Sequence, residues 1–260
     1  MKHQRASASR ISYILGKSAC SPQIAQPLCL LMSMPQECAY CPNPATTKDH
    51  VPPKGFFAKP LPDNLITVPC CEDCNSDASL DDEYVRLILA MRYDVYEHPD
   101  VEQVLGRAIR SLARPEAAGF RNAFVKTVRE VELRTAAGLI LGKTGKFDAD
   151  LSRLNRVFSR VLKGLYFKQK GKRVPASCEV SVIVLDSVDD RDGQILLELQ
   201  RTIAFLNDVP ETVVGRDVFR YRLKFVHDEP DSGIALITLY STVHMLGYII
   251  NRIPEKDQEA

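Results

Sequence analysis

Two pairs of cysteines, each with two residues between its members, constrain this chain of 260 residues more than any other feature. The first pair is Cys38 and Cys41, the second is Cys71 and Cys74, and 29 residues separate the two pairs. A tight turn lets both thiolates of such a pair face one metal ion, and four thiolates complete the tetrahedral coordination that Zn²⁺ adopts in structural sites. We therefore predict that these four cysteines bind a structural zinc ion that staples the ends of residues 42–70 together.

The segment that contains these pairs, residues 36–80, has little capacity to fold without such a staple. It is short, rich in Cys, Pro, Asn and Asp, and poor in helical periodicity, so it can bury little apolar surface. Cys70 adjoins a predicted ligand, and we expect its side chain to point elsewhere. Paired cysteines in a chain of this size indicate metal binding in a reducing compartment, which predicts a cytoplasmic protein. On the cysteines alone, a zinc ribbon without catalytic activity is the favoured interpretation.

The residues between and after the two pairs favour a different interpretation. Asp49 is followed by the run His50-Val51-Pro52-Pro53, Asn64 opens the run Asn64-Leu65-Ile66-Thr67-Val68, and Asn75 directly follows the last cysteine. This order of motifs resembles the HNH endonuclease family with its ββα-metal fold. Over about 45 residues the motifs are C-x-x-C, D-H-V-x-P, N-L-x-x-V and C-x-x-C-N. The D-H-V-P-P and N-L-I-T-V-P phrases look like a bacterial subgroup that carries an uncharacterised C-terminal extension.

The resemblance implies a role for each matching residue. His50 matches the general base, and Asn64 matches the asparagine that holds the loop orienting that base. Asp49 and Asn75 match the ligands of a catalytic divalent metal, and the four cysteines match the structural Zn²⁺ site. Carboxylate and amide oxygens are hard ligands, which suit Mg²⁺ or Mn²⁺ better than a second zinc ion. The family resemblance also implies products with 5′-phosphate and 3′-hydroxyl ends.

Each of these residues also has a purely structural interpretation. His50 can hydrogen-bond within its loop, Asn75 can cap a helix, and Asn64 can belong to a plain turn. Asp49 can be a surface carboxylate. The catalytic interpretation of His50 is favoured because Asp49 precedes it and Pro52 follows it, between the two cysteine pairs. A neutral imidazole, with an ordinary pKa of about 6.5, can take a proton from water at neutral pH.

The charge distribution indicates where nucleic acid would bind. The net charge is only +1, but basic residues concentrate in residues 101–175 and acidic residues in 176–260. Basic side chains recur at helical spacing on one face of residues 148–167, and more lie among residues 48–59, and such cations can follow a phosphate backbone. The candidate nucleic-acid contacts are Lys48, Lys54, Lys59, Arg153, Arg156, Arg160 and Lys163. The alternative is that the stripe is the solvated face of an amphipathic helix. After Asn75 the chain is acidic, where many HNH proteins carry a lysine.

Periodicity predicts an α+β fold with five segments. These are a disordered leader or mis-assigned start (1–35), the zinc-stapled HNH module (36–80), a helical connector (81–115), an α+β domain with an antiparallel sheet (116–253) and a tail (254–260). Predicted helices cover residues 79–96, 101–113, 148–167 and 192–207, and predicted strands cover 123–135, 139–147, 179–186 and 218–226. Residues 234–250 are predicted to be a long strand or a hairpin. No apolar run reaches about 18 residues, so no membrane span is expected.

The leading hypothesis is therefore an HNH-type endonuclease that hydrolyses phosphodiester bonds, with DNA as the expected partner, Zn²⁺ as structural metal and Mg²⁺ or Mn²⁺ as catalytic metal. One alternative is a zinc-dependent module that binds nucleic acid without cleaving it. Another is a nuclease effector controlled by a sensing C-terminal domain. Convergence of Asp49, His50 and Asn75 in the fold discriminates between catalysis and binding alone.

Overall fold

The computed structural model describes residues 36–135, 137–185 and 193–252, with side chains omitted at 193–196. The predicted leader and tail lie outside these ranges. The described residues all belong to one compact unit, so the elements below are described together. No described helix has the length and apolar character needed to cross a membrane.

The N-terminal part of this unit is a β-hairpin followed by a short helix. Strands β1 (Thr47–Val51) and β2 (Ile66–Cys70) pair antiparallel, with Asp49 opposite Val68. Their connection contains the 3-10 helix η1 (Lys54–Phe56). Helix α1 (Glu72–Asp77) follows β2 directly, and Cys71 caps it by accepting a hydrogen bond from the backbone N–H of Cys74. The order is therefore strand, strand, helix.

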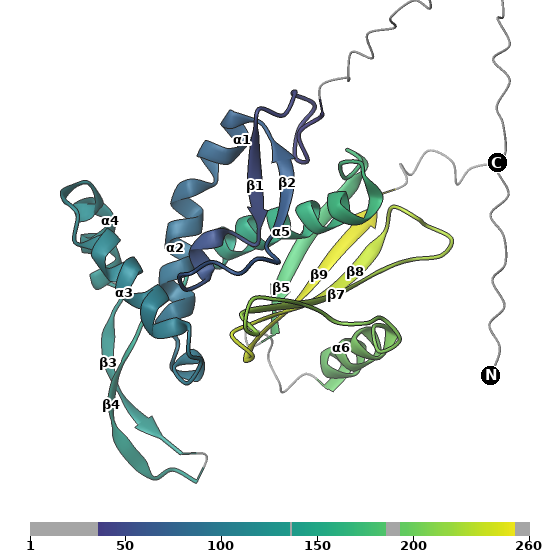
Figure 1. Cartoon of the computed structure of the whole chain (residues 1–260). Coiled ribbons are helices and arrows are strands. Elements are labelled where there is room, and N and C mark those ends of the chain that lie inside the picture. The colour runs from purple at the N-terminus through teal and green to yellow at the C-terminus, as the bar shows by residue number, and fades with distance from the viewer. Residues whose placement is uncertain (1–35, 136, 186–192, 253–260) are drawn as a thin grey trace, which may run out of the picture. The chain divides into compact units, whose positions relative to one another are not determined.

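Three further helices and a second hairpin follow (Figure 1). Helix α2 (Ser79–Ala90) packs against α3 (Val101–Leu112), and the 3-10 helix η2 (Tyr93–Val95) connects them. The 3-10 helix η3 (Pro115–Ala117) leads into α4 (Ala118–Val125). Strands β3 (Arg129–Arg134) and β4 (Ile140–Lys146) pair antiparallel and extend away from the larger sheet.

Helix α5 (Leu151–Lys170) is the longest element, and its ends carry clear signals. Asp150 caps its first turn by accepting from the N–H groups of Ser152 and Arg153. Gly171 ends it in the left-handed conformation, with φ of 68°, which glycine adopts without steric cost. The apolar face of α5, with Phe158, Leu162 and Leu165 fully buried, forms the centre of the core.

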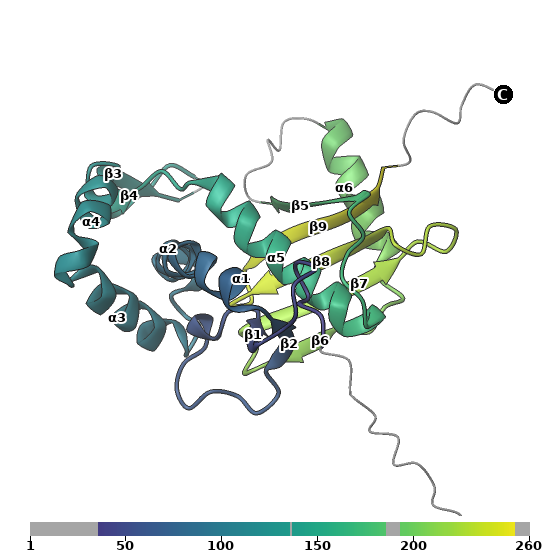
Figure 2. The ribbon, with the colours of Figure 1, turned by 90° about the horizontal axis from the view of Figure 1, so that it is seen from above.

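A five-stranded antiparallel sheet completes the fold, in the order β5-β9-β8-β7-β6. Its strands are β5 (Cys178–Val184), β6 (Thr212–Val214), β7 (Phe219–Phe225), β8 (Gly233–Leu239) and β9 (Val243–Asn251). Helix α6 (Gly193–Phe205) lies on one face of the sheet and α5 on the other (Figures 1 and 2). The β1–β2 hairpin packs on the side of α5 that faces away from the sheet.

One hydrophobic core joins these layers. Side chains from the hairpin, from α2 and α3, from α5 and from the sheet belong to a single buried cluster that includes Val51, Val68, Phe158, Ile237 and Ile249. The predicted boundaries at residues 80 and 115 therefore do not coincide with breaks in this core. Glycine at position 247 lets β9 approach α5, since a Cβ there would lie 2.8 Å from Cδ2 of Leu162.

The α+β class and the antiparallel sheet confirm the sequence prediction, with local corrections. Residues 118–125 are helical, so the predicted strand from 123 to 135 shrinks to Arg129–Arg134. Phe120 and Phe124, one helical turn apart, stack on Tyr84 and Phe147, a spacing that favours helix. The helix predicted to reach residue 96 ends at Ala90, and Arg92 is extended.

Candidate functional site

Four cysteine thiols converge where β2 meets α1. The Sγ atoms of Cys38, Cys41, Cys71 and Cys74 all lie within 4.8 Å of one another. Four thiolates about 2.3 Å from a tetrahedral zinc ion lie about 3.8 Å apart, so this cluster can hold a metal ion such as zinc. Burial acts to raise the pKa of the Cys38 thiol, but hydrogen bonds from the backbone of Cys71, Tyr40 and Cys41 lower it to about 7. That direction favours the thiolate, the form that binds metals, at Cys38, whereas burial raises the pKa of the Cys74 thiol.

Cys70 lies beside this cluster but does not belong to it. It is fully buried, and its Sγ donates to the carbonyl oxygen of Cys71 at 3.2 Å. Burial raises the pKa of this thiol to about 12. Its sulfur is not one of the four that converge, although it lies beside the Cys38 thiol, which also acts to raise its pKa.

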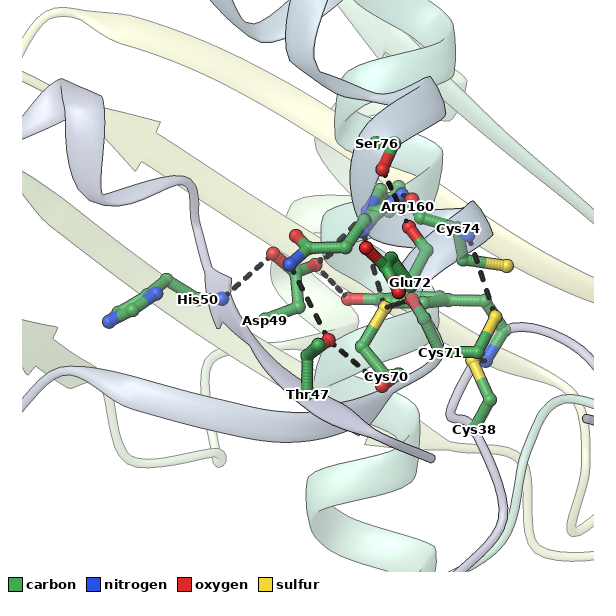
Figure 3. A network of polar contacts seen from close by, with 12 residues as sticks. Cys38, Thr47, Asp49, His50, Cys70, Cys71, Glu72, Cys74, Ser76 and Arg160 are labelled. Carbon is green, nitrogen blue, oxygen red and sulfur yellow. Dashed lines mark hydrogen bonds and ion pairs between the residues drawn. The ribbon is translucent and has the colours of Figure 1, made fainter. Parts of the chain in front are cut away.

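Asp49 lies on β1 and is held by contacts to both of its carboxylate oxygens (Figure 3). Its Oδ1 accepts the backbone N–H of His50 at 2.9 Å. Its Oδ2 accepts the hydroxyl of Tyr40 at 2.7 Å and the Nε of Arg160 at 3.0 Å. The side chain of Asp49 is only 13% exposed and that of Arg160 is 17% exposed. Asp49 is thus a nearly buried carboxylate in an ion pair, which excludes the interpretation as a surface carboxylate.

Arg160 comes from α5, 111 residues further along the chain. Besides Asp49, its guanidinium donates to the carbonyl oxygen of Cys74 and contacts Sγ of Cys70 at 3.7 Å. It also lies 4.3 Å from the centre of the Tyr40 ring, which is a cation–π contact. One side chain of the C-terminal part therefore ties together β1, the segment before it and the second cysteine pair.

His50 points to the opposite side of β1 from Asp49, because successive residues of a strand face opposite ways (Figure 3). It is half-buried, and burial, with the nearby Lys54 cation as the second cause, lowers the pKa of the imidazole below its ordinary value of 6.5. Among the described residues, no group hydrogen-bonds to either ring nitrogen. The lowered pKa favours the neutral form of the ring, and no other described residue engages either of its nitrogens.

Asn75 lies on the same side of β1 as Asp49. Its Nδ2 contacts Oγ1 of Thr47 at 3.5 Å, and Thr47 precedes Asp49 by two residues, so both face the same way. The side chain of Asn75 is exposed, and within the described ranges its Oδ1 has no hydrogen-bond partner. Asn75 does not cap α1, a role that Cys71 fills. The fold thus brings Asp49 and Asn75 to one face, with His50 on the other.

Asn64 holds the loop that follows His50 through both ends of its side-chain amide. Its Nδ2 donates to the carbonyl oxygen of Val213 at 3.0 Å, and its Oδ1 accepts the N–H of Gly215 at 3.1 Å. Asn64 therefore fastens the loop between β1 and β2 to the end of the large sheet. No contact in the described structure joins Asn64 to His50 itself, so an effect of this loop on the orientation of the base stays a prediction.

Three arginines of the basic stripe on α5 form ion pairs inside the fold, while the nucleic-acid contacts of the stripe stay a prediction. Arg153 and Arg156 both bind Asp81, each through its Nε at 2.6 Å, and Arg160 binds Asp49. The Arg156 hydrogen bond is the main cause that lowers the pKa of Asp81. Asp81 of the acidic run after Asn75 is therefore the internal partner of Arg153 and Arg156, although the Arg156 side chain remains 58% exposed.

The predicted lysines near His50 remain available. Lys48, Lys54 and Lys59 are exposed, and none forms an ion pair with another described residue. Lys163 on α5 is partly buried and likewise has no ion pair in the described part of the chain. Cations that can meet phosphate thus gather in the N-terminal part, on and after β1.

Two contributors to the site carry no signal in the sequence. Tyr40 lies inside the first cysteine pair, where an aromatic residue has no fixed meaning, and Gly164 lies within a helix. Both become informative only through their contacts with β1. Comparison of the chain with protein-family models, with curated proteins and with solved structures finds no match.

Proposed function

We propose that this chain is a metal-dependent endonuclease of the HNH type that hydrolyses phosphodiester bonds, with DNA as its substrate. In this proposal the four cysteines hold structural Zn²⁺, and His50 is the general base. Asp49 and Asn75 hold the catalytic Mg²⁺ or Mn²⁺. The strand, strand, helix order of residues 47–77 and the position of the thiol cluster at the start of α1 are compatible with the ββα-metal arrangement.

The observation that carries the proposal is the state of His50. A histidine kept for structure normally has a partner on at least one ring nitrogen. This one is half-buried, has a lowered pKa and has no ring partner among the described residues. A neutral imidazole of this kind can accept a proton from a water molecule as that water attacks phosphorus, a contribution of about 10²–10⁴-fold in rate.

The donor atoms on the other face of β1 fit a hard divalent cation. Asp49 offers Oδ1, whose one partner in the described structure is the N–H of His50, and Asn75 offers an unpartnered amide oxygen. Two oxygens leave coordination positions for water and phosphate, as Mg²⁺ sites in proteins commonly do. A cation bound there would stabilise the charge that develops on phosphate and on the leaving oxygen.

The placement of base and carboxylate also suits in-line displacement at phosphorus. The attacking water and the leaving oxygen must lie on opposite sides of the phosphate. His50 and Asp49 are consecutive on one strand, so their side chains stay close along the chain yet face opposite ways. A phosphate near β1 would meet the base on one side and the carboxylate on the other. Lys48 and Lys54, both exposed, can neutralise neighbouring phosphates.

A second candidate function is nucleic-acid binding without cleavage. Two observations favour it. His50 faces the opposite side of β1 from Asp49 and Asn75, so the three side chains do not converge on one face. The ion pair between Asp49 and Arg160 also matters, because a neutralised and nearly buried carboxylate attracts a divalent cation less than a free one does. The two functions share the zinc staple and the lysines. They differ in whether His50 matters for the fate of the bound strand.

The test is cleavage of supercoiled plasmid and of single-stranded DNA by the purified full chain with its zinc retained. Mn²⁺ or Mg²⁺ is added, and His50→Ala is compared with His227→Ala, which alters an exposed histidine of the C-terminal part. We expect cleavage by the wild type and by His227→Ala, and a loss of at least 100-fold in His50→Ala. Binding without cleavage by all three proteins would support the second function. Equal cleavage by all three would sink the assignment of His50.

A further inference from the structure

Asp49 is held in an asymmetric way. Both side chains that bind it, Tyr40 and Arg160, contact the same oxygen, Oδ2. The other oxygen, Oδ1, meets only the backbone N–H of its neighbour His50 within the described ranges. Carboxylates that bind metal ions commonly have their second oxygen fixed by hydrogen bonds from surrounding residues, which orient the first oxygen. The contacts of Asp49 have this pattern.

Arg160 is too firmly held to serve as a removable latch. Its guanidinium has four separate partners, which are Asp49, the carbonyl of Cys74, the sulfur of Cys70 and the ring of Tyr40. It is also largely buried between them. Release of Asp49 would therefore leave the guanidinium in place rather than free it to move. A group with this many fixed contacts is suited to orient its partner.

The helix that carries Arg160 also supports the strand that carries Asp49. Gly164 lies one turn after Arg160 on α5, and a Cβ at this position would lie 2.5 Å from Cγ2 of Val51 and 3.2 Å from the hydroxyl of Tyr40. The missing side chain thus lets β1 and Tyr40 lie directly against α5. This contact is independent of the ion pair and fixes the same strand.

We propose that α5 is a positioning element of the candidate active site, and that Arg160 and Tyr40 are positioning residues for Asp49. They hold Oδ2 so that Oδ1 stays available to a divalent cation on the face shared with Asn75. The site then requires the C-terminal part of the chain, since residues 36–80 lack Arg160 and Gly164. This inference rests on the proposed function, because it assigns a cation to Asp49.

Competition between Arg160 and the cation for Asp49 would predict the opposite effect on the affinity for the cation. If the guanidinium competes with the cation for Asp49, a variant with a weaker hold on the carboxylate will bind the cation more tightly. If it positions the carboxylate, such a variant will bind the cation more weakly. Second partners of metal ligands commonly contribute 10-fold to 100-fold in metal affinity, so the two directions are measurable.

The experiment is titration of the full, zinc-loaded chain with Mn²⁺, followed by electron paramagnetic resonance of the free ion. Tyr40→Phe removes only the hydroxyl bond to Oδ2, and Arg160→Lys keeps the charge but loses the forked contact. Tyr166→Phe is the matched control. Tyr166 also lies on α5 and donates its hydroxyl to an aspartate, Asp231, which also pairs with Lys172. Asp49→Asn identifies the Mn²⁺ that is bound at the site.

We expect Tyr40→Phe and Arg160→Lys to bind Mn²⁺ about tenfold more weakly than the wild type, with affinity unchanged in Tyr166→Phe. Tyr40→Phe decides the question if Arg160→Lys fails to fold. Unchanged or tighter binding in Tyr40→Phe, together with loss in Asp49→Asn, would overturn the positioning role while the cation site stands. Wild-type protein that binds no Mn²⁺ through Asp49 would overturn the cation site and this inference together.

Discussion

Gly164→Ala tests how closely β1 must lie on α5. The added Cβ would lie 2.5 Å from Cγ2 of Val51, where ordinary contacts begin at 3.4 Å, so the strand must retreat. That retreat is about 1 Å, and crowding of this kind costs about 1–3 kcal/mol in a packed core. Alanine returns about 1 kcal/mol through its higher helix propensity. The net loss is therefore up to about 2 kcal/mol in the free energy of unfolding, most of it at the hairpin.

Gly106→Ala is the matched control for this substitution. Gly106 also lies inside a helix, α3, but a Cβ there would meet only the flexible Nη1 of Arg110, at 3.5 Å. The helix propensity then acts alone and should stabilise the protein by about 0.5–1 kcal/mol. Differential scanning calorimetry at one scan rate should show the two variants shifted in opposite directions, by about 2–4 °C per kcal/mol.

Activity should follow the displacement of β1 in the same pair of variants. A shift of about 1 Å in a strand that carries both Asp49 and His50 can lower the cleavage rate by about 100-fold, whereas Gly106→Ala should cleave as the wild type does. The reasoning is refuted if Gly164→Ala raises the melting temperature as Gly106→Ala does. In that case the contact between Gly164 and Val51 would not constrain the strand.

Three further predictions concern the metal cluster, the base and the arginine anchors. Cys41→Ser should lose bound zinc, whereas Cys70→Ala should retain it. Mass spectrometry of the zinc content per chain measures both. Zinc loss in Cys70→Ala would contradict the proposed set of four ligands. Because burial and Lys54 lower the pKa of His50, the acid limb of the pH profile of kcat/KM should lie below pH 6.5. Lys54→Ala should shift this limb to higher pH, whereas Lys59→Ala should leave it in place. An unmoved limb in Lys54→Ala would exclude His50 as the titrating group. Asp81→Asn should lower the free energy of unfolding by about 1–2 kcal/mol at pH 7, since two arginines lose a shared partner. Because the pKa of Asp81 is lowered in the folded state, the stability that Asp81 contributes is present above its ordinary pKa of about 3.9 and is lost as the pH falls below that value. A difference in the free energy of unfolding between Asp81→Asn and the wild type that persists in acid would contradict this.

The parts of the fold that could be predicted depend on local patterns. Spacing alone predicted the cysteine cluster, because two residues between cysteines fix a turn whatever the rest of the chain does. Apolar residues recur about every 3.6 residues in α5 and every 2 residues in the strands β7 to β9, and these periods predict their buried faces. The strand predicted from residue 123 extends the alternation seen at Val131 and Leu133 too far back, into residues 118–125, where Phe120 and Phe124 have helical spacing.

The partners of polar residues could not be predicted in the same way. Arg153 and Arg156 have the spacing of an exposed basic face, but they meet an aspartate more than 70 residues earlier in the chain. Asn64 resembles a turn residue, and its partners lie about 150 residues later. Such pairs depend on how the hairpin packs on α5 and on the sheet, which no local pattern encodes. The same packing explains why the roles of Arg160 and Tyr40 emerge only from the structure.

The central claim is that His50 removes a proton from the attacking water. Single-turnover cleavage of an end-labelled DNA duplex by His50→Ala, with and without added imidazole, tests it most directly. We predict a loss of about 10²–10⁴-fold that imidazole partly reverses, and more so as the pH rises and the neutral form accumulates. A variant that cleaves as fast as the wild type without imidazole would contradict the claim.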